Sequence, residues 1–161
     1  MPTLTPCLWF DTQGEDAADF YASVFPNSRI TNVSRYSEAG PGTPGTAMVV
    51  NFELDGQPFM VLNGGPQFTF SEALSFQIDC ESQDEVDYYW NALTEDGGQE
   101  GPCGWLKDRF GLSWQVVPRR LPELLGDADR ERSQRVMRAM LAMKKIDVAE
   151  LERAAAEPQP V

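Results

Sequence analysis

The chain has 161 residues, a formal net charge of −12 and no histidine. This length suffices for a hydrophobic core without disulfides, and 42% apolar residues are typical of a globular protein. The missing histidine excludes Ser-His-Asp and Cys-His nucleophile pairs, and it also excludes every histidine-ligated metal site.

The charge is unevenly distributed along the chain. Residues 1–106 contain 16 acidic and 2 basic side chains, whereas residues 107–161 contain 9 acidic and 11 basic ones. An acidic body repels phosphate backbones, so we expect no nucleic-acid partner. The basic tail is expected to dock on the acidic body or on a second subunit.

Cysteine usage and hydropathy predict a cytoplasmic protein. Cys7, Cys80 and Cys103 are odd in number, far apart and free of any CxxC motif, so neither a disulfide framework nor a zinc knuckle is indicated. No stretch approaches eighteen apolar residues, and the first thirty residues do not resemble a secretory leader. We therefore expect no membrane association.

The first half of the chain shows the pattern strand, helix, strand, strand, strand. The expected ranges are, in chain order, 5–10, 17–24 (helix), 29–36, 47–54 and 59–62. Pro26 ends the helix, and Asp55-Gly56 is typical of a two-residue β-hairpin.

The same order begins again at residue 74. A strand over 74–80 precedes a helix that starts at the capping box Ser82-Gln83-Asp84-Glu85 and ends at Gly97-Gly98, and short strands follow near 99–100, 105–107 and 113–117. With a shift of 68 residues, the motif D-x-x-D-[FY]-Y occurs in both halves, from Asp16 and from Asp84. The prediction is an α+β core over 1–118, made of two βαβββ modules at about 1–66 and 72–118.

A helical extension is expected over 119–161. Val136, Met140 and Met143 share one helical face, and Asp147 begins a last helix. Glu150 completes a capping box there, while Ile146 and Leu151 form a hydrophobic staple.

Several segments carry a resemblance to a known family. They are Thr5-Pro6-Cys7-Leu8-Trp9-Phe10, the Phe20-Tyr21 pair with Phe25, the block from Pro102 to Gln115, and the segment from Arg135 to Asp147. The chain resembles the glyoxalase-like vicinal-oxygen-chelate superfamily, and within it the PhnB-like group labelled 3-demethylubiquinone-9 3-methyltransferase. The resemblance implies two βαβββ modules that form an incomplete barrel around a cavity, assembled as a homodimer.

In superfamily members that use a metal, the ligands come from the first and last strands of each module. The repeat gives Cys7 and Ser75 for the two first strands, and alignment of Gly56 with Gly111 gives Met60 and Gln115 for the two last strands. The set lacks imidazole and carboxylate, so we predict no metal and no other cofactor. A Cu(I) site between Cys7 and Met60 is the remaining metal alternative.

Aromatic side chains complete the predicted ligand-cavity set. Trp9 and Trp114 lie on strands beside the four positions above, and each could face the cavity or the core. No glycine-rich turn joins a first strand to a helix, so the residues do not support S-adenosylmethionine binding of the doubly wound type.

Three functional hypotheses follow. The first is metal-free binding of a small apolar or aromatic metabolite. The second is an enzyme of the same superfamily with another substrate, and the third is a structural or regulatory module whose basic helices bind a protein. Whether the chain is an enzyme stays open at this point.

Overall fold

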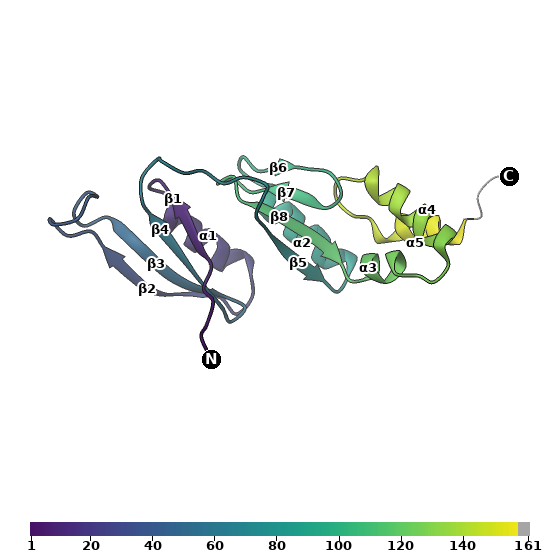
Figure 1. Ribbon diagram of the computed structural model, residues 1–161, viewed down its shortest axis with the longest axis horizontal. Helices are drawn as coiled ribbons and strands as arrows, with labels where there is room; N and C mark the ends of the chain where they lie inside the picture. The colour runs from purple at the N-terminus through teal and green to yellow at the C-terminus, as the bar shows by residue number, and fades with distance from the viewer. Residues whose placement is uncertain (158–161) are drawn as a thin grey trace. The chain divides into compact units, whose positions relative to one another are not determined.

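A computed structural model describes residues 1–157 of the chain (Figure 1). The chain divides into two compact units, one from Met1 to Phe70 and one that begins at Ser71. The boundary falls between the two predicted βαβββ modules. The C-terminal helices belong to the second unit rather than forming a unit of their own.

The first module contains one helix and a four-stranded sheet. Its elements are β1 (Cys7–Phe10), α1 (Gly14–Val24), β2 (Arg29–Arg35), β3 (Ala47–Leu54) and β4 (Gln57–Asn63). The strands lie in the order β1-β4-β3-β2, with β1 parallel to β4 and the other pairs antiparallel. Asp55 and Gly56 have φ values of 46° and 79°, as a two-residue turn with two left-handed positions requires.

The second module repeats this topology. Its elements are β5 (Ser75–Cys80), α2 (Gln83–Thr94), β6 (Gln99–Glu100), β7 (Trp105–Lys107) and β8 (Ser113–Pro118). The order β5-β8-β7-β6, with β5 parallel to β8, matches the first sheet position by position. The predicted α+β fold with a duplicated βαβββ unit is confirmed, and each sheet is open rather than closed.

Each sheet buries one face against its helix. In the first module Ala17, Ala18 and Tyr21 of α1 are fully buried, and Tyr21 stacks on Phe52 of β3 with ring centroids 6.4 Å apart. Full burial of a large apolar side chain such as that of Phe52 stabilises the fold by about 1.5–3 kcal/mol. Because successive strand residues point to opposite faces, the strand residues between those that contact α1 lie on the face that α1 does not cover.

Asn63 fixes the start of α1 to the end of β4. Its Oδ1 accepts a hydrogen bond from the Gly14 amide at 2.8 Å, and its Nδ2 donates to the Ala47 carbonyl at 3.1 Å. A Cβ on Gly14 would lie 2.6 Å from that Oδ1, so a larger residue does not fit there. The buried amide therefore ties together three elements of the module.

The predicted capping box of α2 is present with one difference. Ser82 Oγ accepts from the Glu85 amide at 3.3 Å, as expected, but the Glu85 carboxylate accepts from the amide of Glu81 at 2.7 Å. The helix ends at Thr94, and Asp96 and Gly97 then adopt positive φ.

The extension forms three helices: α3 (Arg120–Leu125), α4 (Arg130–Leu141) and α5 (Val148–Ala156). They enclose a small core in which Val136, Ile146 and Leu151 are completely buried. Asp147 caps α5 through the Glu150 amide at 3.1 Å, as predicted. Helix α3 did not stand out in the sequence pattern.

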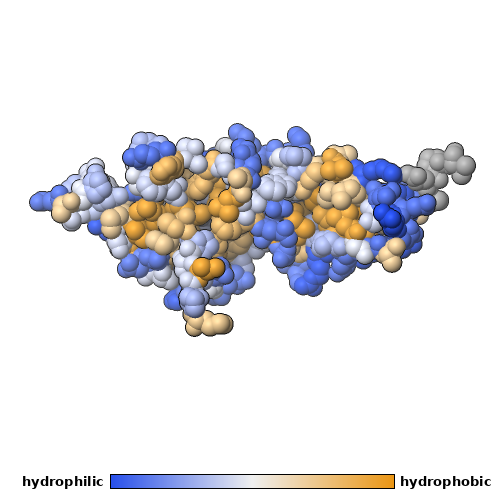
Figure 2. All heavy atoms as spheres, viewed as in Figure 1, coloured by the Kyte–Doolittle hydropathy of each residue, from blue (hydrophilic) through white to orange (hydrophobic). Residues whose placement is uncertain are grey.

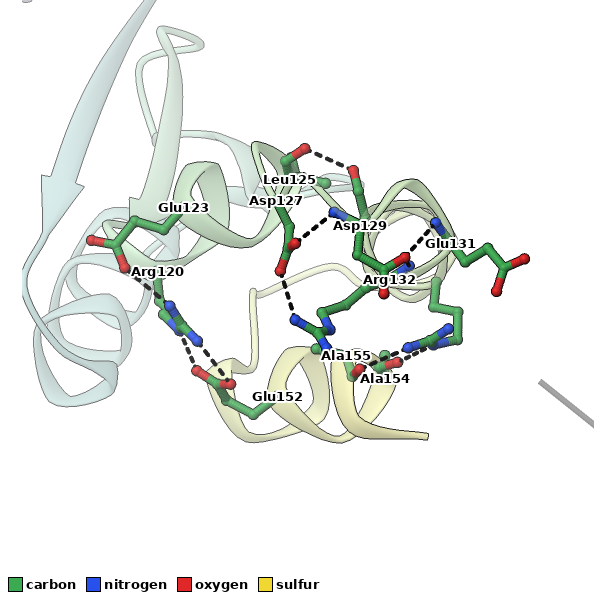
Figure 3. A network of polar contacts seen from close by, with 12 residues as sticks. Arg120, Glu123, Leu125, Asp127, Asp129, Glu131, Arg132, Glu152, Ala154 and Ala155 are labelled. Carbon is green, nitrogen blue, oxygen red and sulfur yellow. Dashed lines mark hydrogen bonds and ion pairs between the residues drawn. The ribbon is translucent and has the colours of Figure 1, made fainter. Parts of the chain in front are cut away.

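Charged groups tie the three helices together (Figure 3). Arg120 pairs with Glu123 of its own helix and with Glu152 of α5. Arg132 pairs with Asp127 at 3.1 Å. Exposed pairs of this kind contribute about 0–1 kcal/mol each, so the buried core supplies most of the stability of the extension.

The extension docks on the second module, the first of the two docking alternatives predicted for the basic tail. Gln83 donates from Nε2 to the Ile146 carbonyl at 3.0 Å and accepts from the Val148 amide at 2.8 Å. Ion pairs Lys145–Asp87 (2.8 Å) and Arg119–Glu81 (2.7 Å) add to this contact. Within residues 1–157, no helix is both long and apolar enough to cross a membrane.

We expect Gln83→Ala to destabilise the protein by about 1–3 kcal/mol, because the change leaves the Ile146 carbonyl and the Val148 amide at the start of α5 without their partner. Chemical denaturation measures the loss. Gln57→Ala is the matched control, since Gln57 is exposed and its side chain, within residues 1–157, bonds only the carbonyl of its neighbour Pro58. Equal stability of both variants would contradict the anchoring role of Gln83.

Candidate functional site

The uncovered face of the first sheet is largely apolar. Cys7 lies opposite Met60 in the β1–β4 ladder, and Met60 lies opposite Asn51 in the β4–β3 ladder. Trp9, Leu62 and Val49 form the next row across the same strands. Cys7 is exposed and the others are half-buried, and Figure 2 shows apolar residues at the surface over the strands of this unit.

Trp9 is held rigidly on this face. Its indole N–H donates to the Gly65 carbonyl at 2.8 Å. Its ring contacts the Phe68 ring edge-on, with ring centroids 4.9 Å apart. A Cβ on Gly64 would lie 2.3 Å from the indole, so the glycine is needed for this close approach. The ring therefore offers a fixed aromatic surface beside Met60.

The uncovered face of the second sheet is more polar. Gln115 Nε2 donates to Ser75 Oγ at 2.9 Å, which brings together the two residues predicted for this module. In the β5–β8 ladder, however, Ser75 lies opposite Ser113, and Gln115 lies opposite Gln77. Ser113 rather than Gln115 therefore takes the register position that Met60 has in the first sheet.

Trp114 lies on the opposite face of β8 from Gln115. It is 3% exposed, and its indole N–H donates to the buried carboxylate of Asp108 at 2.9 Å. Asp108 also accepts from the amides of Phe110 and Leu112, so the pair fixes the turn that precedes β8. Of the two tryptophans proposed for the ligand cavity, Trp9 is on an uncovered face and Trp114 is in the core.

The thiols of Cys7 and Cys80 are poorly disposed to form thiolates. Although Cys7 is exposed as a residue, partial burial of its thiol raises the pKa of Cys7 above its usual value. Burial, with the nearby carboxylates of Glu85 and Asp79, raises the pKa of Cys80 to about 12. A protonated thiol is a weak metal ligand and a weak nucleophile.

The donor set does not fit the divalent metal that many members of the fold family bind. Cys7 and Met60 offer a protonated thiol and a thioether, and the Ser75 hydroxyl is already bonded to Gln115. Among residues 1–157, no three His, Cys, Asp or Glu side chains gather into a metal-binding group. The prediction that the protein uses no metal stays a prediction.

Two cavities lie outside the predicted residues. One, of about 570 Å³, lies in the first module beside the loop from Tyr36 to Thr46, where Arg35 pairs with Glu15 at 3.2 Å. The other, of about 480 Å³, lies in the second module and includes Ser113. Strand alternation from Gln115 could have drawn attention to Ser113, but serine at a strand start carries no distinctive signal.

The match to a family model covers residues 2–117, which is most of the chain, and the model describes 3-demethylubiquinone-9 3-methyltransferases. The chain belongs to this family, a PhnB-like group of the vicinal-oxygen-chelate superfamily. No curated protein matches it. The extension beyond residue 118 lies outside the matched segment.

Solved structures agree with the family. The PhnB protein of Bacillus cereus, assigned to the same methyltransferase family, is 35% identical, with a TM-score of 0.65 over 73% of this chain and 99% of its own. A protein from Pseudomonas aeruginosa is 19% identical, with a TM-score of 0.60 over 73% and 98% of the two chains. The fosfomycin resistance protein FosX from Mesorhizobium loti is 12% identical, with a TM-score of 0.57 over 78% and 98%. The last two show the fold alone.

The family label names a methyltransferase, but the described fold lacks the usual cofactor cradle. Each sheet has one parallel strand pair and is otherwise antiparallel, unlike the doubly wound parallel sheet that places a glycine-rich turn at the cofactor. That the label lacks mechanistic support stays a prediction.

Alkylation kinetics test the state of the thiols. We expect iodoacetamide labelling of Cys7 to rise with pH and to reach its midpoint above pH 9.0, because burial disfavours the thiolate. Cys80 is expected to stay unlabelled in the folded protein. Peptide mass spectrometry resolves the three cysteines, and a Cys7 midpoint below pH 8 would reveal a stabilised thiolate.

Proposed function

We propose that this PhnB-like protein is a metal-free, cytoplasmic, homodimeric binding protein for a small apolar or aromatic metabolite. The observation that carries the proposal is the uncovered face of the first sheet. Cys7, Trp9, Met60 and Leu62 form a surface with one thiol, one indole, one thioether and one aliphatic side chain on the paired strands β1 and β4. Ligand sites are mostly apolar, with a few polar groups that set orientation.

The second module has polar residues on the corresponding face of its own sheet. Ser75 and Gln115 hydrogen-bond to each other, and the amide oxygen of Gln115 is a further acceptor for a ligand hydroxyl. Both residues lie on the sheet face that α2 does not cover. Their neutrality favours an uncharged ligand over a metal ion.

Exposed apolar side chains support the homodimer. Phe68 and Leu74 are large apolar residues with 64% and 54% of their surface exposed. Coverage of such groups by a second copy would remove apolar area from water. The three cysteines are all free, which supports a reducing compartment such as the cytoplasm.

Metal content is the most direct test of this function. Protein purified without chelator is expected to contain less than about 0.1 transition-metal ion per subunit, because the available donors are neutral. Elemental analysis gives the ratio, and native mass spectrometry gives the dimer mass.

A gain-of-site variant provides the matched control. Cys7→His combined with Met60→Glu places an imidazole and a carboxylate at ladder-paired positions, and it is expected to retain more zinc after dialysis than the unaltered protein. About one metal ion per subunit in the unaltered protein would contradict the proposal and favour an enzyme of the same superfamily.

A further inference from the structure

The cavity of about 480 Å³ in the second module has a defined wall. Its lining comes from Glu72 before β5, from β6, β7 and the loop between them, and from the start of β8. Lys107 lies opposite Ser113 and Trp105 lies opposite Gln115 in the β7–β8 ladder, so these four residues share one sheet face. The cavity is therefore on the uncovered face of the second sheet.

Ser113 is the unusual residue of this cavity. It is 1% exposed, and within the described part of the chain its hydroxyl has no hydrogen-bond partner. A buried hydroxyl without a partner is costly, and folded proteins rarely leave one unsatisfied. A ligand atom that bonds this hydroxyl would remove that cost.

The charged groups at the cavity are already engaged. Lys107 forms an ion pair with Glu72, and the Glu100 carboxylate accepts from the indole N–H of Trp90 at 2.8 Å. An anionic ligand would meet two carboxylates and one neutralised ammonium group. The electrostatics consequently disfavour an anionic ligand.

Apart from Gln99, the remaining lining is largely apolar and includes the Trp105 ring, Pro102 and Leu106. Aromatic side chains favour flat aromatic partners through stacked or edge-on contacts. A volume of about 480 Å³ lies within the range of cavities that enclose small organic molecules.

The extension holds one wall of the cavity in place. The amides of Cys103 and Gly104 donate to the carbonyls of Met143 and Lys144 at 2.9 and 2.8 Å. A Cβ on Gly104 would lie 2.9 Å from the Val116 carbonyl, and Cys103 itself has a φ of 57°. The loop is thereby fixed in a conformation that a free chain would rarely adopt, so the site is pre-formed.

We propose that this cavity binds a neutral, flat aromatic molecule that carries one hydroxyl group, with that group hydrogen-bonded to Ser113. This inference rests on the proposed small-molecule function. It adds a binding site in the second module and a class of ligand. It also gives the extension a role, since the Met143 and Lys144 carbonyls accept the hydrogen bonds that hold the loop at Cys103 and Gly104 in place.

The test uses two probes of the same shape, 2-naphthol and 2-methylnaphthalene, titrated into full-length protein and followed by amide NMR shifts. We expect 2-naphthol to bind about tenfold more tightly, which corresponds to 1.4 kcal/mol. Ser113→Ala is expected to remove this difference by weakening 2-naphthol alone. Ser37→Ala, on an exposed loop of the first module, is expected to leave both affinities unchanged.

Cysteine protection locates the bound probe. Cys103 lines the cavity and is partly exposed, whereas Cys7 lies in the first module. Bound 2-naphthol is expected to slow iodoacetamide labelling of Cys103 and to leave Cys7 unaffected.

Two results would overturn the inference in distinguishable ways. Protection of Cys7 alone, with Ser113→Ala binding normally, would place the ligand elsewhere and leave the proposed function standing. Absence of binding by either probe up to its solubility limit would remove the cavity proposal, and the metal measurement would still decide the proposed function. Because Ser113→Ala removes an unsatisfied hydroxyl, the variant is expected to fold at least as stably as the unaltered protein.

Discussion

One helix covers one face of each four-stranded sheet, and this constraint governs the rest of the protein. In the first module Tyr21 and Phe52 fill the space between helix and sheet, and in the second Trp90 and Leu93 do so from α2. Period-two alternation then assigns every other strand residue to the uncovered face. Chemistry at that face is free to change without altering the core that folds the module.

The two uncovered faces have diverged in this way. The first is aromatic and apolar around Trp9 and Met60, and the second is polar around Ser75 and Gln115. Duplicated modules in the superfamily can present metal ligands on these strands, but here the paired positions Cys7–Met60 and Ser75–Ser113 present a thiol, a thioether and two hydroxyls. The backbone geometry of the fold is therefore kept while its donor chemistry is changed, which favours binding of a neutral organic molecule.

The fold was largely predictable because local signals agreed with one another. The Asp55-Gly56 turn, the Ser82 and Asp147 caps and the shift of 68 residues each have a physical signature in sequence, and the structure contains all of them. The site was less predictable. Alternation alone does not say which face a helix covers, so Trp114 could not be separated from Trp9, and Ser113 became notable only through its burial and its lack of a partner.

The central claim is that ligands bind on the uncovered sheet faces and not on the helix-covered ones. Methyl NMR of protein labelled at Met, Leu and Val, recorded against a set of neutral aromatic fragments, tests it most directly. The account predicts shifts for Met60, Leu62 and Val49 or for the residues around Ser113, with the methyl groups of Val61 and Val86 unmoved. Shifts confined to those buried methyl groups, or to the helices of the extension, would contradict it.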